Sequence, residues 1–251
     1  MNLAILQARM TSTRLPGKVL KPLNKVEPML LHQIRRILKS KLIDELIVAT
    51  SIGKEDDEIV NLCKQNNILY YRGSLDDVLD RFYAVSLQYT PKNIIRLTGD
   101  CPLIDPKIID KVISLHICNE NDYTSNVIIP TYPDGMDVEV LTYETLIKIK
   151  KSASRPSHKE HVTLYLNENR EKFKTENVTY NKDLSEIRLT VDEYEDLELI
   201  QKVYNKLQNK GDYTLEDIII LFKNEPELLN INKQFNRNEG LVKSLENEGR
   251  C

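Results

Sequence analysis

The sequence predicts an α/β protein with a mostly parallel central sheet and helices on both of its faces. In the first half of the chain, short β-branched segments alternate with longer segments whose apolar side chains recur at helical spacing. Such alternation is typical of βαβ units, in which a helix connects two parallel strands. The strand segments are also apolar along nearly their whole length, as expected of a sheet that is buried on both faces.

The expected elements of the first half follow one another in chain order. Strands and helices alternate at residues 2–7, 28–39, 45–50, 55–65, 68–71, 76–88, 93–98 and 106–118. The segment 45–50 (ELIVAT) has the β-branched composition of a strand. The acidic start of 76–88 suits the positive N-terminal end of a helix dipole.

The second half mixes strands and helices less regularly. Around a turn-rich segment we expect strands at 122–127 and 136–141. Further on we expect a helix at 158–168, an antiparallel strand pair at 173–180 and 186–191, and helices at 196–208 and 215–223. We expect residues 1–227 to form a single domain, and the polar, Asn-rich residues 228–251 to be a loose tail or a partner-contacting arm.

Composition excludes several classes of protein. The chain of 251 residues carries 35 Lys+Arg against 38 Asp+Glu, which argues against the basic face that a nucleic-acid partner requires. Its apolar runs are far shorter than the ~18–20 residues of a membrane span, and its N-terminus lacks the features of a signal peptide. The four cysteines have no CxxC spacing. We therefore expect a cytoplasmic enzyme or binding protein with no nucleic acid partner and no membrane insertion.

The loop after the first strand is strongly basic. Five cations and no acid precede Glu27, namely Arg9, Arg14, Lys18, Lys21 and Lys25. Open α/β sheets bind ligands at the carboxyl ends of their strands, and cations with free backbone N–H groups suit a polyphosphate. The alternative is a solvated basic loop. The segment is neither a Walker A loop nor a Rossmann fingerprint, since it lacks their glycine spacing.

Two aspartates stand at the ends of expected strands. Asp100 follows the strand 93–98 through Gly99, and Asp192 ends the strand 186–191. Two such carboxylates opposite a polyphosphate would hold Mg²⁺, with phosphate oxygens and water as its other ligands. The alternative for each is an ordinary turn or helix-capping residue.

Several motifs together resemble the cytidylyltransferase family. They are QARMTSTRLPGKVLKPL, YRGSLDDVLDRFY, RLTGDCPLIDP, DYTSN, YPDGMDVEV, KEHVTLYL and RLTVDEYEDLELI. They are most similar to the SpsF-like branch of spore-coat and surface-polysaccharide synthesis, with CMP-KDO and CMP-sialic acid synthetases as more distant relatives. The resemblance implies a GT-A-like nucleotide-diphospho-sugar transferase fold, CTP as donor, Mg²⁺ as cofactor, pyrophosphate as product and a homodimer.

The resemblance also assigns roles to residues. Arg9, Arg14 and Lys18 match the triphosphate-binding loop, with Arg14 and Lys18 expected to be catalytic, and Asp100 and Asp192 match the metal-binding aspartates. The expected nucleotide contacts further include Gln7, Ala8, Arg72, Gly73, Ser74, Arg81, Thr98 and Gly99. The expected contacts to a sugar-type acceptor are Asn126, Asp137, Glu139 and His161.

Two positions depart from the family pattern. The KDO enzymes carry Gln where this chain has Thr98, and the SpsF-like branch has Arg-Glu-His where this chain has Lys159 before Glu160 and His161. From the residues alone, a histidine such as His161 is more often a core residue than a ligand, and a pair such as Asp137 and Glu139 is usually the solvent-exposed face of a strand.

The resemblance implies that an acceptor oxygen attacks the α-phosphorus of CTP and that pyrophosphate leaves. Arg14 and Lys18 would neutralise the charge that develops on the leaving group, without a covalent protein nucleophile. The acceptor would be an acidic sugar or a sugar phosphate. The alternatives are a GT-A-type glycosyltransferase that uses Asp137-Val138-Glu139 as its metal motif, or a non-catalytic nucleotide-binding protein.

Overall fold

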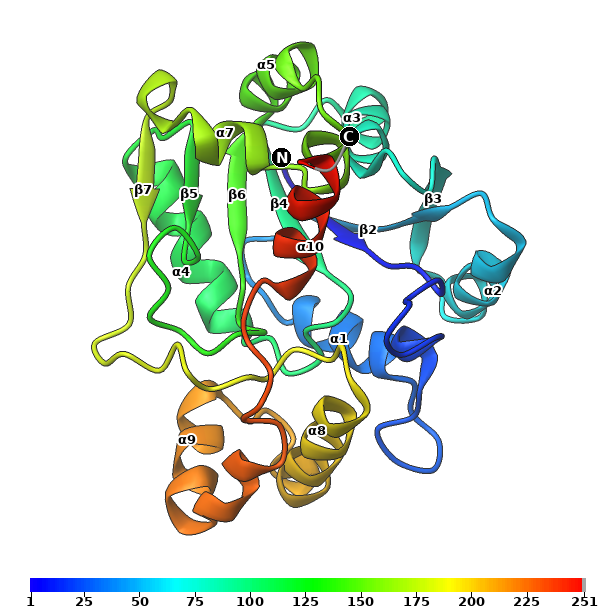
Figure 1. The fold of residues 1–251 in the computed structure, drawn as a ribbon, viewed down its shortest axis with the longest axis vertical. Helices are drawn as coiled ribbons and strands as arrows, with labels where there is room; N and C mark the ends of the chain where they lie inside the picture. Colours follow the sequence, from blue (N-terminus) through cyan, green and yellow to red (C-terminus); the bar gives the residue numbers. More distant parts are fainter. Residues whose placement is uncertain (250–251) are drawn as a thin grey trace.

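A seven-stranded sheet forms the centre of the protein in a computed structural model that describes residues 1–249 (Figure 1). The strand order is β3-β2-β1-β4-β6-β5-β7. The strands are β1 (Asn2–Gln7), β2 (Glu45–Ser51), β3 (Leu69–Gly73), β4 (Asn93–Thr98), β5 (Tyr123–Ser125), β6 (Glu139–Thr142) and β7 (Thr175–Asn177). Strand β6 is antiparallel to both of its neighbours, and the remaining pairs are parallel. The predicted mostly parallel α/β sheet is confirmed.

Helices cover both faces of the sheet. They are α1 (Met29–Ile37), α2 (Asp57–Gln65), α3 (Val78–Tyr89), α4 (Pro106–Cys118), α5 (Tyr143–Ser152), α6 (Pro156–Glu160), α7 (Leu164–Glu168), α8 (Tyr194–Leu207), α9 (Leu215–Asn224) and α10 (Glu239–Glu248). Within residues 1–249, no helix is long and apolar enough to cross a membrane.

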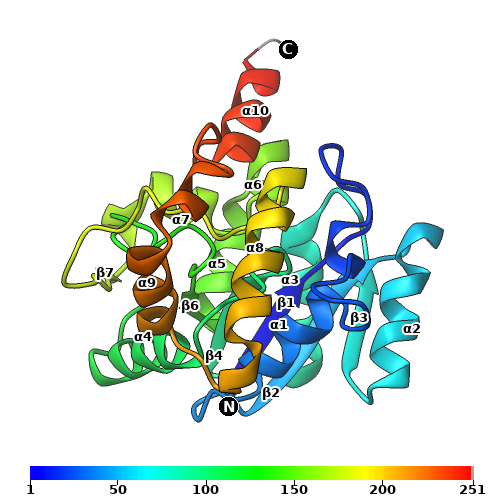
Figure 2. The ribbon, with the colours of Figure 1, turned by 90° about the horizontal axis from the view of Figure 1, so that it is seen from below.

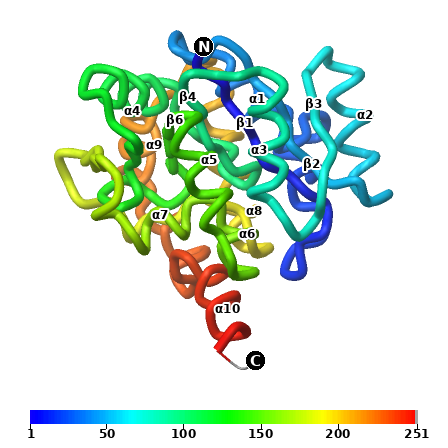
Figure 3. The backbone as a smooth tube through the Cα atoms, turned by 90° about the horizontal axis from the view of Figure 1, so that it is seen from above, coloured from blue at the N-terminus to red at the C-terminus, as the bar shows by residue number. Residues whose placement is uncertain are grey.

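Alternate residues of each central strand enter two separate apolar cores. In β1, Ala4 and Leu6 pack with α1, α4, α8 and α9, whereas Leu3 and Ile5 pack with α3 and α5. Because side chains alternate across a strand, a segment that is apolar throughout buries both faces at once. Figure 3 shows the resulting helix layers on either side of β1 and β4.

The strand register brings the ends of β1 and β4 together. Gln7 lies opposite Thr98, and the Gly99 amide donates to the Gln7 carbonyl at 2.8 Å. A Cβ atom at Gly99 would stand 3.0 Å from that carbonyl oxygen, so glycine permits this close approach. Asp100 therefore leaves the sheet beside the basic loop that follows β1.

Two expected elements of the second half are wrong. The helix expected at 158–168 is two short helices, α6 and α7, because His161 leaves the helical conformation with φ −105° and ψ 83°. The antiparallel pair expected at 173–180 and 186–191 does not form, since β7 joins β5 in parallel. Residues 186–191 instead run beside Asp134 and Asp100, where the Val191 amide donates to the Asp100 carbonyl at 2.8 Å.

The C-terminal segment, described up to residue 249, contacts the rest of the protein, and its role as a loose tail or a partner-contacting arm stays a prediction. Asn232 is buried and donates to the Arg188 carbonyl and to Asp196, which fixes the chain beyond α9. From there the chain returns to the sheet, and α10 lies beside α6 and points away from the body of the protein (Figures 1 and 2). Residues 250 and 251, which include Cys251, lie outside the described residues. The single domain of residues 1–227 stays a prediction.

Candidate active site

Two adjoining pockets open at the carboxyl ends of β1 and β4. The larger pocket has a volume of about 600 Å³ and the smaller one about 300 Å³. Both are lined by Arg96, Thr98, Asp137, His161, Asn238 and Leu241. The larger pocket receives the basic loop after β1, which is the place where an open α/β sheet binds its ligand.

Lys18 joins the two predicted metal-binding aspartates in the larger pocket. Its Nζ donates to Asp100 Oδ2 at 3.0 Å, to Asp192 Oδ1 at 2.7 Å and to the Val191 carbonyl at 2.8 Å. Gly17, with φ 67°, makes the turn that directs Lys18 inward. Burial alone would lower the pKa of Lys18, but the charges of Asp100 and Asp192 outweigh it and raise that pKa. Burial would likewise raise the pKa of Asp100, but the Lys18 charge holds it below its usual range.

Arg14 adds a second cation at the same place. Its guanidinium contacts Asp192 at 3.0 Å and Glu193 and Glu239 at 3.4 Å each. Asp192 is also held at 3.3 Å by the buried Arg188. The arrangement therefore concentrates charge of both signs, as a site for a polyphosphate with a metal ion requires.

The two aspartates fit a divalent cation. Asp100 and Asp192 converge on one cationic atom, the Lys18 ammonium, so a single ion can contact both carboxylates. Among residues 1–249, no group of three His, Cys, Asp or Glu side chains is arranged to hold a metal. An ion at this position would therefore take its other ligands from phosphate oxygens and water, as Mg²⁺ commonly does.

Gln7 and Arg81 bring unpaired polar atoms to the wall of the larger pocket. Across the described chain, Gln7 Oε1 and the Nε and Nη1 atoms of Arg81 are buried without a hydrogen-bond partner. Burial, and after it the charge of Arg9, lower the pKa of Arg81 to about 10. Gly73 makes room for this side chain, since a Cβ there would stand 2.8 Å from Arg81 Cγ. Unpaired buried groups are costly, so a ligand that pairs with them is strongly favoured.

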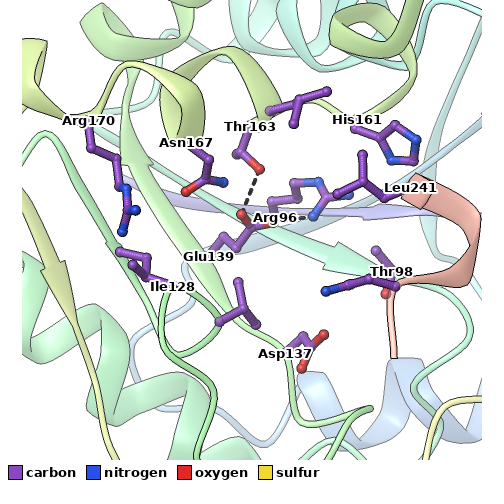
Figure 4. A pocket seen from close by; sticks show the side chains of 13 residues that line it. Arg96, Thr98, Ile128, Asp137, Glu139, His161, Thr163, Asn167, Arg170 and Leu241 are labelled. Atoms are coloured by element: carbon purple, nitrogen blue, oxygen red, sulfur yellow. Dashed lines mark hydrogen bonds and ion pairs between the residues drawn. The ribbon is translucent and has the colours of Figure 1, made fainter. Parts of the chain in front are cut away.

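The smaller pocket contains a buried ion pair. Arg96 pairs with Glu139, which also accepts hydrogen bonds from the Tyr123 hydroxyl and from Thr163 at 2.7 Å. In Figure 4, Arg96 and Thr163 meet Glu139 in the middle of the pocket, and Arg170 lies across the pocket from Thr98. Burial would raise the pKa of Glu139, but Arg96 lowers it, so the carboxylate stays charged.

Most of the predicted site residues come together. The larger pocket is lined by Gln7, Ala8, Arg9, Arg14, Lys18, Arg81, Thr98, Gly99, Asp100, Asp137, His161 and Asp192. Glu139 lines the smaller pocket. His161 is half-buried, and its Nε2 contacts the Ser244 hydroxyl at 3.0 Å, so its side chain faces the pocket and not the core.

Four predicted contacts do not line either of the two pockets that residues 1–249 form. They are Arg72, Gly73, Ser74 and Asn126. Arg72 pairs with Asp57 at 2.6 Å and donates to backbone carbonyls. The Ser74 hydroxyl accepts from the Asp77 amide just before α3. Asn126 donates to the Met136 carbonyl and accepts from the Val138 amide. Their polar groups hold the backbone, and Gly73 accommodates Arg81.

Other residues at the site were not predicted. Arg96, Thr163 and Arg170 line the smaller pocket, and Arg188 lines the larger one. A charged residue within the apolar strand 93–98 was a usable signal for Arg96. Residues 238–247 carried no signal, because their composition is that of an exposed helix.

A mostly parallel sheet with clustered cations and carboxylates at its strand ends is typical of nucleotide-binding α/β proteins. The sequence profile of the family described as Cytidylyltransferase matches residues 3–238. The chain belongs to this family and is therefore a nucleotidyltransferase, which confirms the predicted fold and family.

Individual relatives agree with this assignment. The chain is 37% identical over 231 residues to the spore coat polysaccharide biosynthesis protein SpsF of Bacillus subtilis, covering 90% of this chain and 95% of that protein. It superposes with a TM-score of 0.87 on a cytidylyltransferase of Leptospira borgpetersenii at 33% identity, covering 91% and 96% of the two chains. A CMP:2-keto-3-deoxy-manno-octonic acid synthetase solved with CTP has a TM-score of 0.60 at 18% identity, covering 82% and 98%, and shares the fold.

Proposed function

We propose that the protein transfers the CMP group of CTP to an acidic sugar or a sugar phosphate and releases pyrophosphate, as a step in surface-polysaccharide synthesis. The observation that carries this proposal is that Lys18 contacts both Asp100 and Asp192, with Arg14 also on Asp192. The resemblance to SpsF supports the polysaccharide role, and the fold shared with a synthetase solved with CTP supports the donor.

The basic loop would bind and polarise the triphosphate. Arg14 and Lys18, which both line the larger pocket, would neutralise the charge that develops on pyrophosphate as the acceptor oxygen attacks in line. Asp100 and Asp192 would hold Mg²⁺, which supplies further neutralisation of phosphate charge when bound. Lys18 would donate to phosphate oxygens of the bound nucleotide when the two carboxylates hold the metal ion. Positioning and electrostatics then account for catalysis, and no covalent nucleophile is needed.

The unpaired atoms of Gln7 and Arg81 suit the edge of a cytosine. Cytosine offers an amino donor, which Gln7 Oε1 can accept, and ring N3 and O2 acceptors, to which the Arg81 guanidinium can donate. Pairing these groups would relieve the cost of burying them unpaired. We therefore propose that these two side chains contribute to the choice of CTP.

The smaller pocket is our proposed acceptor site. It adjoins the larger pocket at Thr98, Asp137 and His161, and its wall combines the amide of Asn167 with the exposed cation Arg170. Amide and hydroxyl groups suit a sugar, and Arg170 suits its carboxylate or phosphate.

The glycosyltransferase alternative is less well supported. Its metal motif would need Asp137 and Glu139 to be available, yet Asp137 is paired with Arg237 and Glu139 with Arg96. Asp100 and Asp192 are also paired, with Lys18, but they adjoin the basic loop and their side chains are 26% and 18% exposed, whereas the side chain of Glu139 is 5% exposed.

The decisive experiment incubates the protein with Mg²⁺, each of the four nucleoside triphosphates in turn, and a panel of acidic sugars and sugar phosphates. We expect pyrophosphate to form with CTP and at least one acceptor, and not with the Asp192→Asn variant. A parallel incubation replaces the nucleoside triphosphate with a nucleotide sugar. Release of a nucleoside mono- or diphosphate there, with no pyrophosphate formed in the first incubation, would favour the glycosyltransferase instead.

We further propose that the protein acts in the cytoplasm as a homodimer. Both statements follow from the sequence and from the family resemblance. Light scattering coupled to size-exclusion chromatography tests the dimer, and a monomer at micromolar concentration would contradict it.

A further inference from the structure

Helix α10 begins where the match to the family ends. The family match covers residues 3–238, and α10 spans Glu239–Glu248. Even so, the helix contributes Glu239, Leu241, Lys243 and Ser244 to the wall of the larger pocket. This chain therefore places a segment outside the matched region directly over its proposed nucleotide site.

The first residue of α10, Glu239, forms an ion pair with Arg14 of the basic loop. Glu239 contacts Arg14 Nη1 at 3.4 Å, and its other carboxylate oxygen accepts from the Asn236 amide at 3.0 Å. The side chains of Arg14 and Glu239 are 22% and 26% exposed, so the pair is only partly shielded from water. The Glu239 carboxylate therefore lies at the position on the Arg14 guanidinium where a phosphate oxygen of the proposed nucleotide would bind.

Polar contacts fasten the rest of the helix. The Ser244 hydroxyl donates to Glu160 at 3.0 Å, and Glu248 accepts from the amide and hydroxyl of Ser157 at 2.6 and 2.7 Å. Throughout Glu239–Glu248, no residue is buried. Elements that bury little apolar surface open at low free-energy cost.

We propose that α10 is a lid that Glu239 holds closed on Arg14, and that the triphosphate of the nucleotide opens it by taking Arg14 from Glu239. The lid rests on the proposed function, since its opening ligand is the nucleotide of that site. Glu239 and the triphosphate compete for one guanidinium, and their like charges repel each other. Binding and closure therefore oppose each other, and by linkage each weakens the other equally.

The variant Glu239→Gln tests the competition. It keeps the size of the side chain and removes the charge, so its affinity for both CTP and inorganic tripolyphosphate should rise by about three- to tenfold. The matched control is Glu246→Gln, which removes the same charge from an exposed position of α10 that is outside the pocket wall. Isothermal titration calorimetry of the full-length proteins, with each ligand, measures the effect.

Hydrogen exchange of the α10 amides gives a second readout. In the wild type, exchange should quicken when tripolyphosphate binds, and without ligand it should be faster in Glu239→Gln than in the wild type. Equal affinities of Glu239→Gln and wild type, or slower exchange of α10 in the presence of tripolyphosphate, would overturn the lid.

The two ligands separate the lid from the proposed function. Tighter tripolyphosphate binding by Glu239→Gln without any CTP binding would keep the lid and refute the function. CTP binding that is unaffected by Glu239→Gln would refute the lid and keep the function. If wild type and variant bind neither ligand, both are refuted.

Discussion

Replacing Lys18 with methionine removes the charge that joins Asp100 to Asp192 and keeps most of the side-chain length. The Lys18 side chain is 11% exposed, and those of its partners are 26% and 18% exposed. Breaking a fully buried ion pair from one side costs about 3–5 kcal/mol, whereas an exposed pair contributes less than about 1 kcal/mol. This partly exposed cluster lies between the two limits, so we expect a loss of about 2 kcal/mol. For a chain of this size the melting temperature should fall by about 4–8 °C.

Lys18→Met should also slow catalysis more than it weakens binding. A preorganised charge at a developing anion contributes about 10²–10³ in rate, so kcat should fall by that factor while KM for CTP changes less, since Arg9 and Arg14 remain. Mg²⁺ should restore more of the melting temperature in the variant than in the wild type, because it replaces the missing ammonium between the carboxylates.

Calorimetric melting with and without Mg²⁺, together with steady-state pyrophosphate release across a CTP titration, measures both effects. Lys25→Met is the matched control, since Lys25 is an exposed cation of the same basic segment. A Lys18→Met protein of wild-type stability, or one with unchanged kcat and only a raised KM, would refute the reasoning.

Three further predictions concern other parts of the structure. Asp100→Asn and Asp192→Asn should each abolish turnover. Each should lower the free energy of unfolding by about 1 kcal/mol or less, since both side chains are partly exposed. Activity at low Mg²⁺ would show that the altered residue is not a metal ligand. Arg81→Met should remove the cost of burying two unpaired nitrogens, so the free protein should be no less stable than the wild type. The thermal shift with CTP should shrink toward the shift with UTP, and an undiminished preference for CTP would show that Arg81 takes no part in base recognition. Burial lowers the pKa of His116 to about 4, so between pH 6.5 and 4 the unfolded chain binds a proton that the folded protein does not. As the pH falls through this range, the free energy of unfolding should decrease by up to about 1.4 kcal/mol per pH unit. Denaturant titrations of His116→Leu should show a flatter pH dependence, and an unchanged slope would exclude His116 as the source.

Much of the fold could be predicted because local pattern and tertiary structure agree in the first half. The helix α4 begins at Pro106, after Asp105 accepts a hydrogen bond from the Lys107 amide, and both signals are visible in the sequence. The parallel pairing of β7 with β5 could not be predicted, because three polar residues at a sheet edge have no apolar alternation that would identify their partner. The break at His161 depends on contacts that are distant in sequence, including the bond from Thr163 to Glu139.

The candidate site, like the fold, could be predicted only in part. Lys18 and Asp100 could be placed together because each follows a strand of the parallel sheet, and the strand ends of such a sheet share one edge. Asp192 was placed with them by the family resemblance, since the antiparallel pair expected at 186–191 does not form. The structural roles of Arg72 and Asn126 were not predictable, because their partners are mainly backbone groups that only the folded chain brings near. The resemblance to a family gave no information on α10, since the matched motifs end before it.

The fate of the individual phosphorus atoms of CTP tests the central claim most directly. The protein would be incubated with Mg²⁺, an accepted sugar, and CTP labelled either at the α- or at the γ-phosphorus. Transfer of the CMP group predicts that the α label appears in the sugar product and the γ label in pyrophosphate, with both transfers lost in Asp100→Asn. Appearance of the γ label in the sugar, or of the α label in free CMP alone, would contradict nucleotidyl transfer.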